Sequence, residues 1–598
     1  MREFSLPALY EVPADGNLTD LIRRNAAQHP DVTVISRKID GVWLDVTAAD
    51  FLTEVRRVAK GLIASGVQPG DRVGLMSPTR YEWTLFDFAI WTAGAVTVPI
   101  YETSSNEQVE WILGDSDAVG CVVASPVHEA AVEAVRERLP QLKHVWQLDA
   151  GGVDSLVDSG VDVSDTTVEE RTTAANADSP ATIVYTSGTT GRPKGCVLTH
   201  RSFFTECGNA VERLGPLFST GHSSVLLFLP LAHVFGRLVE ICAVLAPIRL
   251  GHCPDVKEVT AELASFRPTL VLGVPRVFEK VYNSARAKAQ AEGKGKIFDK
   301  AAAVATDYSR ALDTPEGPSL ALKFKHKVFD RLVYSKLRAA LGGRATHAIS
   351  GGGPLGERLG HFYRGIGFTV LEGYGLTESC AATTFNPWDR VKIGTVGQPL
   401  PGSSVGIAED GEVLLRGDHL FTGYWNNPDA TEAAHTDGWF HTGDIGRLDD
   451  DGYLTITGRK KEIIVTAGGK NVAPAVIEDR IRAHSLVAEC MVVGDGRPFV
   501  GALITLDDEF LPRWAEQNGK GANTTAAGLK DDPDLLAAVQ QAVDDGNAAV
   551  SKAEAVKKFR VLETHFTEES GHLTPSLKLK RNVVLKDFAG EIEAIYAR

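Results

Sequence analysis

The stretch from Tyr185 to Gly195 combines residue types that suit a polyphosphate, and it reads YTSGTTGRPKG. Glycines let backbone N–H groups approach an anion closely, hydroxyl groups donate further hydrogen bonds, and the lysine supplies a fixed positive charge. The spacing differs from that of the common P-loop, and the alternative interpretation is a polar turn between two strands. The residues predicted to bind phosphate are Thr186, Ser187, Gly188, Thr189, Thr190, Gly191 and Lys194.

Two later segments could hold an adenine nucleotide and its metal ion. THAISGGGPL predicts a strand that ends in a glycine turn, where backbone without side chains lets a flat ring approach closely. In LEGYGLTES, the ring of Tyr374 can stack on adenine, Thr377 can bind the α-phosphate, and Glu378 offers hard oxygen atoms to Mg²⁺. Each residue alone fits an ordinary loop, but the run in this order is a strong signal. The predicted nucleotide contacts are Gly352, Gly353, Glu372, Gly373, Tyr374 and Thr377.

Three further motifs contain residues of catalytic type. In WFHTGDIG, the carboxylate of Asp444 suits hydrogen bonds from both ribose hydroxyls, with a surface turn as the alternative. His233 ends a predicted strand in LAHVFGR, where an isolated histidine is more often part of the core. Lys578 lies in LTPSLKLKR, which on its own resembles a basic tail.

Together these motifs resemble the signature of the adenylate-forming superfamily, which includes acyl-CoA synthetases, luciferases and the adenylation domains of peptide synthetases. They follow the family's order from about Asn17 to Lys586. Within the family, the chain is most similar to the bacterial long-chain fatty acyl-CoA synthetases. The expected ligands of Mg²⁺ are Glu378 and Thr186.

The resemblance implies roles for further residues. His233 would flank the acyl carboxylate and change rotamer between half-reactions, Arg459 would contact ribose and phosphate, and Lys461 would be the hinge between two domains. Gly468 and Gly469 would leave room for the pantetheine arm of coenzyme A.

The family places its catalytic lysine after a threonine, a spacer, a serine and a glycine. Here Thr574, Ser576 and Lys578 match this pattern, while Leu577 replaces the glycine, as is typical of long-chain synthetases. Lys578 is therefore the candidate adenylation lysine, and Lys580 is its competitor.

The implied reaction is a two-step ligation that uses ATP, Mg²⁺ and coenzyme A. A long-chain fatty carboxylate attacks the α-phosphate with loss of pyrophosphate, and the CoA thiol then takes the acyl group with release of AMP. Three alternatives stay open: a fatty acyl-AMP ligase that loads a carrier protein, a synthetase for aryl or short acids, and a catalytically silent scaffold that binds lipid or nucleotide. The scaffold is disfavoured by the presence of Lys194, Glu378, Asp444, Arg459 and Lys578.

Strands that alternate with helices predict an α/β fold with a largely parallel sheet and helices on both faces. We expect a large AMP- and acyl-binding domain over residues 1–458, including mixed sheets and a small β-barrel-like subdomain. A hinge would follow at residues 459–461, and residues 462–598 would form a small mobile α+β domain that carries the catalytic lysine. The segment VLGVPRV, residues 271–277, is expected to be a strand that leads to the acyl pocket.

The apolar run Val239–Ile248 fits either a wall of a fatty-acid tunnel or a core helix. Some long-chain relatives carry a gating aromatic four residues after the histidine, but Arg237 stands at that place here, which puts this device in doubt. Residues 322–338 form a basic helix with an apolar stripe. Such a helix can lie on an anionic membrane surface, although packing on the domain is the favoured interpretation.

Composition narrows the class of protein. A chain of 598 residues is too long to fold around a single hydrophobic core, so two or more domains are expected. Its net charge of −15 argues against broad nucleic-acid binding. The seven cysteines form no Cys-x-x-Cys pair, which predicts buried, reduced thiols and a cytoplasmic protein, with peripheral contact at the inner face of the membrane as an option. Neither a signal peptide nor a spanning segment is expected.

Overall fold

The computed structural model describes residues 2–186, 192–521, 524–574 and 578–597. Its largest sheet has nine strands and is parallel from β14 to β2. The strands in spatial order are β16 (Gln398–Pro399), β15 (Thr384–Phe385), β14 (Thr369–Tyr374), β13 (His347–Ser350), β12 (Leu270–Gly273), β10 (Ser224–Leu227), β11 (Arg249–His252), β2 (Thr33–Ile39) and β3 (Val42–Thr47).

A second sheet has seven strands, of which β8, β5, β4, β6 and β7 run parallel. Its order is β19 (Gly423–Tyr424), β9 (Lys194–Thr199), β8 (Pro180–Thr186), β5 (Val96–Ile100), β4 (Arg72–Met76), β6 (Ala118–Val123) and β7 (His144–Gln147). The first helices of the chain are α1 (Thr19–Gln28), α2 (Ala48–Ala64), α3 (Tyr81–Thr92), α4 (Asn106–Asp115), α5 (Pro126–Glu133), α6 (Gly152–Ser159), α7 (Asp165–Thr172), α8 (His200–Arg213), α9 (Val234–Leu245) and α10 (Val259–Phe266).

The local sequence explains how these helices pack. In α2, Phe51, Val55 and Leu62 lie on one buried face, as their spacing predicts. Helix α3 is predominantly apolar and almost every residue of it is buried, which is typical of a helix enclosed in a core. Both sheets contribute to one large core together with α2 and α3, while one face of the second sheet packs with α4 and α5 in a separate core.

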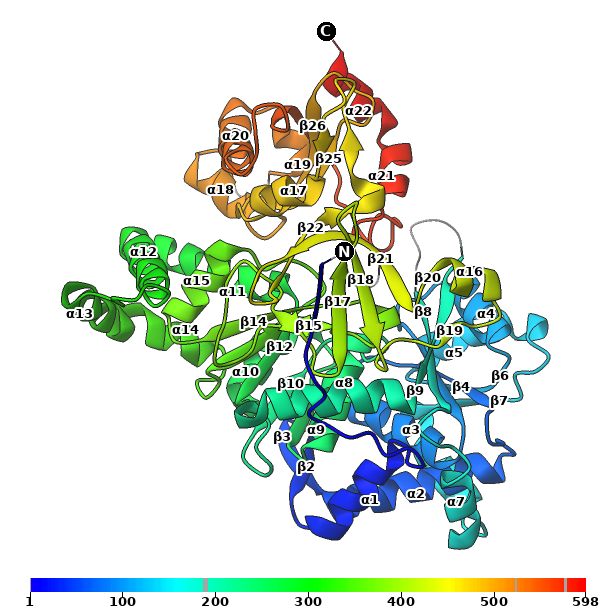
Figure 1. The fold of residues 1–598 in the computed structure, drawn as a ribbon. Coiled ribbons are helices and arrows are strands. Elements are labelled where there is room, and N and C mark those ends of the chain that lie inside the picture. Colours follow the sequence, from blue (N-terminus) through cyan, green and yellow to red (C-terminus); the bar gives the residue numbers. More distant parts are fainter. Residues whose placement is uncertain (1, 187–191, 522–523, 575–577, 598) are drawn as a thin grey trace.

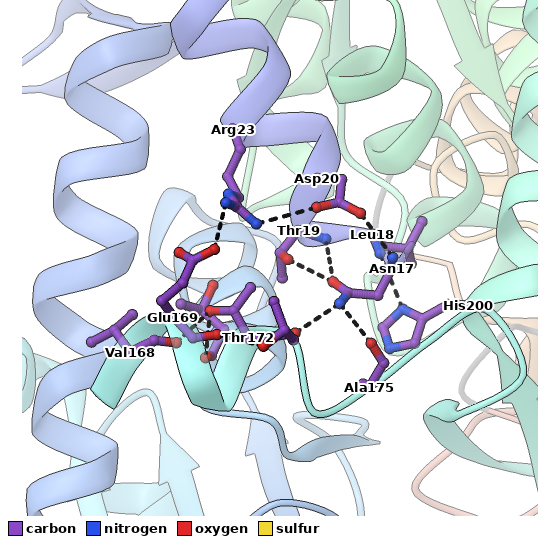
Figure 2. Close-up of polar contacts among 12 residues, drawn as sticks. Asn17, Leu18, Thr19, Asp20, Arg23, Val168, Glu169, Thr172, Ala175 and His200 are labelled. Atoms are coloured by element: carbon purple, nitrogen blue, oxygen red, sulfur yellow. Dashed lines mark hydrogen bonds and ion pairs between the residues drawn. The ribbon is translucent and has the colours of Figure 1, made fainter. Parts of the chain in front are cut away.

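A polar network fixes the N-terminal segment against the start of α8 (Figure 2). The side-chain amide of Asn17 donates to Thr172 O and Ala175 O at 2.8 and 3.0 Å, and the backbone N–H of Leu18 donates to His200 Nδ1 at 3.3 Å. Buried polar groups are costly unless they are hydrogen-bonded. This network therefore ties α1, α7 and the first residue of α8 into one arrangement.

The third sheet is antiparallel and open, so the expected barrel-like subdomain does not close into a barrel among the described residues. Its strands are β1 (Arg2–Ser5), β17 (Ser403–Ile407), β18 (Glu412–Gly417), β21 (Trp439–Leu448) and β20 (His435–Thr436), with β22 (Leu454–Arg459) paired to β21. Helix α16 (Pro428–Ala433) precedes β20.

The C-terminal part has its own core and lies at one end of the molecule, coloured yellow to red in Figure 1. It contains the hairpin β23 (Ile464–Val465)–β24 (Asn471–Val472) and the sheet β25 (Val487–Val493), β26 (Val500–Leu506) and β27 (Val556–Val561). Its helices are α17 (Pro474–Arg482), α18 (Leu511–Gln517), α19 (Ala526–Leu529), α20 (Pro533–Asn547), α21 (Arg581–Asp587) and α22 (Ala589–Tyr596). The α/β class, with a large domain and a small one, is confirmed.

The segment expected to be a strand over residues 271–277 is shorter than predicted. Strand β12 ends at Gly273, and Pro275 begins a long helix. Proline suits the first turn of a helix because its fixed φ fits there and no N–H is needed. The helices of this region are α11 (Pro275–Ala291), α12 (Gly295–Ala311), α13 (Leu320–Phe329), α14 (Ser335–Ala340) and α15 (Glu357–Gly365).

The predicted basic helix is α13, a π-helical turn over Asp330–Tyr334 and α14, and its apolar residues form two stripes with different surroundings. Phe329 and Val333 pack against the core and Leu337 is buried, as the packing interpretation expects. The other stripe is exposed and consists of Leu320, Phe324, Val328 and Leu332. Figure 1 shows α13 at the outer edge of the large domain, away from the small one.

Candidate active site

One cleft brings most of the predicted residues together, at the carboxyl end of several parallel strands and beside the small domain. Ligands of α/β proteins bind in this position because loops from neighbouring strands converge there. The predicted residues that line the cleft are Thr186, His233, Gly352, Gly353, Glu372, Gly373, Tyr374, Thr377, Glu378, Asp444, Arg459, Lys461 and Lys578.

The glycine-rich loop is the connection of a β-hairpin. Strands β8 and β9 are antiparallel, and Thr186 pairs with Lys194 at the end that adjoins the loop. Ser187, Gly188, Thr189, Thr190 and Gly191 lie outside the described residues. The ammonium group of Lys194 lies 4.8 Å from the centre of the Tyr424 ring, a cation–π contact that holds the lysine beside the cleft.

Glu378 lies in a turn that follows β14, next to Tyr424. Tyr424 O–H donates a 2.8 Å hydrogen bond to its Oε1. The next residues, Cys380 and Ala381, have φ of 54° and 103°, values that residues other than glycine rarely adopt. Backbone strain of this kind concentrates at functional sites. A half-buried carboxylate with lone pairs left over is a suitable oxygen ligand for Mg²⁺, so this site fits the implied metal.

Asp444 and Arg459 face the same cleft from paired positions on β21 and β22. Tyr374 O–H donates to Asp444 Oδ2 at 2.7 Å, and Arg459 Nε donates to Oδ1 at 2.8 Å. The Asp444 side chain is buried, so these two bonds keep its charge compensated. The three residues therefore form a connected polar unit where a ribose is predicted to bind.

Gly352 and Gly353 lie in the bend between β13 and α15. Gly352 has φ of 81°, and a Cβ at either position would meet no atom closer than 3.9 Å, so the turn offers flat, open backbone. Beneath it, Glu372 Oε1 accepts a 2.8 Å hydrogen bond from Leu355 N–H. Burial of Glu372 raises its pKa to about 7.

The raised pKa of Glu372 predicts a pH-dependent stability. Between pH 4.5 and about 7 the folded protein binds a proton that the unfolded chain has lost, so stability falls as pH rises through this window. Glu372→Gln keeps an acceptor for Leu355 N–H and removes the titration. We expect the variant to be more stable than the wild type at pH 8, by up to about 3 kcal/mol, and similar at pH 4.5. Urea unfolding of both proteins at each pH measures this, and a pH-independent difference would contradict it.

His233 is the N-cap of α9, and its Nδ1 accepts a 3.2 Å hydrogen bond from Phe235 N–H. Desolvation lowers its pKa to about 3, and the positive charge of Lys578 adds to the shift. The imidazole is therefore neutral at physiological pH.

Lys578 lies in a small hairpin of the C-terminal domain. Its backbone N–H donates to Thr574 Oγ1 at 3.0 Å, and Thr574 N–H donates back to Lys578 O at 2.8 Å. The side chain keeps surface open to the cleft, but surrounding protein lowers its pKa by desolvation, as does Arg459, whereas Asp444 and Glu378 oppose this. Lys578 also reaches the apolar cavity described below, while Lys580 lines only the cleft.

An apolar cavity continues from His233 and Lys578 into the large domain. Leu238, Val239 and Cys242 of α9 form one wall, and Ala210 of α8 with Phe218 forms another. The run Val239–Ile248 thus contributes both to a cavity wall and to a buried helix.

Arg237 does not line this cavity. Its side chain is fully buried and pairs with Asp87, with Nη2 2.7 Å from Oδ1, while Nη1 donates to Thr182 Oγ1 at 2.6 Å. Arg237 therefore does not gate the cavity, as the replacement of the gating aromatic residue by arginine indicated.

Gly468 and Gly469 are not brought together with the other residues. They form the exposed turn of the β23–β24 hairpin, and neither lines the cleft. Lys461 is the middle residue of an exposed 3-10 turn, Lys460–Glu462, between the two cores.

Sequence reasoning missed Tyr424 and Glu206, because neither lies in a motif and only the fold brings them to the cleft and the cavity.

The thiols offer no nucleophile. All seven cysteines lie in the described residues and are buried without disulfides. Burial raises the pKa of Cys196 and Cys380, the two nearest the motifs, well above the ordinary value. Thiolate chemistry at neutral pH is therefore disfavoured.

This fold and cleft define a two-domain nucleotide-dependent enzyme, and comparisons with known proteins agree. The family described as AMP-binding enzyme matches residues 22–425, and the AMP-binding enzyme C-terminal domain matches residues 461–598. The chain belongs to this adenylate-forming family.

Individual relatives cover much of the chain. It is 51% identical to long-chain-fatty-acid–CoA ligase FadD15 of Mycobacterium tuberculosis over the whole length of both, and 38% identical to putative fatty-acid–CoA ligase fadD11 of the same species over 71% of this chain and 75% of the relative. Among solved structures, ATP-bound MatB from Rhodopseudomonas palustris has a TM-score of 0.69 at 25% identity, covering 96% of this chain and 99% of MatB. The anthranilate CoA ligase AuaEII with anthranoyl-AMP, at 20% identity, has a TM-score of 0.73 and shows the fold alone, covering 98% and 99%.

Proposed function

We propose that this protein is an ATP-dependent long-chain fatty acid–CoA ligase that forms an acyl-adenylate and then a thioester. The observation that carries the proposal is the position of Lys578, which borders both the polar cleft and the apolar cavity. A carboxylate at the mouth of the cavity and a nucleotide in the cleft would meet beside this ammonium group. Full-length similarity to the mycobacterial ligase FadD15 supports the same activity.

In the first step, the carboxylate oxygen attacks the α-phosphorus and pyrophosphate leaves. Negative charge gathers in the transition state, so fixed positive groups are the main means of catalysis. Lys578 would bridge carboxylate and α-phosphate, Thr377 would bind the α-phosphate, and Lys194 would hold the leaving group. Mg²⁺, when bound by Glu378 and Thr186, supplies further positive charge at the phosphates. Neutral His233 would flank the carboxylate without repelling Lys578.

In the second step, the CoA thiol attacks the acyl carbon and AMP leaves. The Gly468–Gly469 turn would have to replace Lys578 at the cleft for this step. A rotation of residues 462–598 about Lys461 would achieve the exchange, because a hinge concentrates large backbone changes in a few residues. The domain boundaries, 1–458 and 462–598, follow from this proposal.

The first test is AMP release from ATP and Mg²⁺ with palmitate, with and without CoA, using acetate and benzoate as controls. CoA-dependent turnover with palmitate alone is the expected result. Acyl-adenylate that accumulates without use of CoA would point to a ligase for a carrier protein. Absence of ATP cleavage with every acid would support the catalytically silent scaffold.

We also propose that the exposed stripe of α13 contacts an anionic membrane surface. Leu320 and Phe324 are 85% and 71% exposed, and the stripe continues one turn at a time through Val328 and Leu332. Around it, the exposed basic residues are Lys323, Lys325, Lys327, Arg331 and Lys336. Apolar side chains within a ring of positive charge suit a helix that lies in the headgroup region. No helix in the described part of the chain has the length and apolar character needed to cross a bilayer.

Replacing two residues of the stripe by acids tests this contact. We expect Phe324→Glu with Leu332→Glu to weaken co-sedimentation with phosphatidylglycerol vesicles at least about tenfold, because burial of large apolar side chains is lost. Val127→Glu is the matched control, since Val127 is 77% exposed on another helix. Equal vesicle binding by the double variant and the control would contradict the proposal.

A further inference from the structure

One polar side chain in the wall of the apolar cavity has no role in the reaction above. Glu206 lies on α8, is fully buried, and lines the cavity together with Ala210, Leu238 and Cys242. Its Oε1 accepts a 3.1 Å hydrogen bond from Ala382 N–H. Its Oε2 is buried and has no hydrogen-bond partner among the described residues.

A buried carboxyl group with a free oxygen is unfavourable in an apolar wall unless a partner reaches it. Among the described residues, the titratable groups near Glu206 are the thiols of Cys207, Cys242 and Cys380, which provide no counter-charge, and burial raises the pKa of Glu206 well above the ordinary value. Glu206 is therefore a neutral carboxylic acid, able both to donate and to accept a hydrogen bond.

The position of this group along the cavity follows from α9. His233 caps the helix at the cavity mouth, and Cys242 lies nine residues further on, roughly 13 Å along the helix axis. Because Glu206 faces Cys242, it lies inside the cavity, where the carbon chain of a bound fatty acid would pass if its carboxylate lay at the mouth.

We propose that Glu206 determines substrate specificity by hydrogen-bonding an oxygen-bearing substituent, a hydroxyl or a keto group, in the interior of the acyl chain. The inference rests on the proposed ligase activity, because the cavity must hold the acyl chain. An unsubstituted chain leaves Oε2 of Glu206 without a hydrogen-bond partner. A fatty acid with a hydroxyl or keto group at the chain position next to Glu206 would supply that partner. The protein would then favour oxygenated fatty acids whose substituent reaches this point.

The experiment measures kcat/KM for CoA thioester formation with palmitate and with a series of hydroxyhexadecanoic acids whose hydroxyl moves along the chain. We expect one interior position to exceed its neighbours by about three- to tenfold, the effect of one hydrogen bond. Glu206→Leu should remove this maximum without a matching loss of palmitate activity, and Glu206→Gln should retain it. Glu240→Gln is the matched control, since Glu240 is equally buried on α9 but does not line the cavity.

A wild-type profile without a maximum at any interior position would overturn the proposal, and this result needs no variant to fold. A Glu206→Leu variant that loses palmitate and hydroxy-acid activity by the same factor would also overturn it, because Glu206 would then only hold the Ala382 turn. Failure of the proposed function is distinct, since palmitate itself would then give no thioester.

Discussion

Lys578→Ala is expected to lower acyl-adenylate formation at least about 100-fold, while the protein still converts supplied acyl-adenylate and CoA to thioester at a rate near that of the wild type. The reason is electrostatic. Among the described residues, Lys578 is the cation that borders both the cleft and the apolar cavity, and a single fixed charge at a developing negative group typically contributes this much. Its role ends once the adenylate has formed, so the second half-reaction is spared.

The measurement is pyrophosphate release with ATP and palmitate, followed by thioester formation from palmitoyl-AMP in the same preparation. Lys580→Ala is the matched control, because Lys580 lies two residues away and lines only the cleft. We expect it to keep most of both activities. Equal loss of both half-reactions in the Lys578 variant would refute the assigned role, since it would indicate general damage to the hairpin that Thr574 and Lys578 form.

Sequence alone could predict the residues that belong to local motifs. Tyr374 and Asp444 lie 70 residues apart, yet each was predicted to face the nucleotide, and the fold joins them by a 2.7 Å hydrogen bond. Motifs of this kind can be recognised because a short stretch of sequence contains both the reactive side chain and the residues that shape the backbone around it. The strand that precedes α11 was predicted too long because a short apolar run does not show where Pro275 will start a helix.

Residues whose role depends on tertiary contacts could not be predicted. Tyr424 reaches Glu378 from a two-residue strand, and Glu206 enters the cavity from an otherwise ordinary helix. The two apolar stripes of the basic segment are built from the same residue types, Phe, Val and Leu, and only packing decides that Phe329 is covered while Phe324 is exposed. A periodic pattern predicts which residues share one face of a helix, but it does not predict whether that face packs against the protein or is exposed to solvent.

The contacts between the two domains suggest a second large effect. Arg276 of α11 donates to Ala488 O at 2.9 Å and pairs with Glu489, while Lys280 pairs with Glu509 at 2.8 Å. These contacts are polar, and the Lys280–Glu509 pair is largely exposed, so breaking it costs little. Under the proposed function, these contacts would hold Lys578 at the cleft during the first step, and the backbone at Lys461 would absorb the rotation that breaks them.

Lys461→Pro is expected to retain pyrophosphate release with palmitate and to lower CoA thioester formation at least about 100-fold. Proline fixes φ near −65°, which suits the first turn of the short helix where Lys461 now lies but prevents a large change of that angle. Lys461→Ala is the control, because it removes the same side chain and leaves the backbone free to rotate. Single-turnover assays of each half-reaction separate the two effects. Normal thioester formation by the proline variant would place the hinge elsewhere, and equal loss in the alanine variant would show that the lysine side chain, and not backbone rotation, is required.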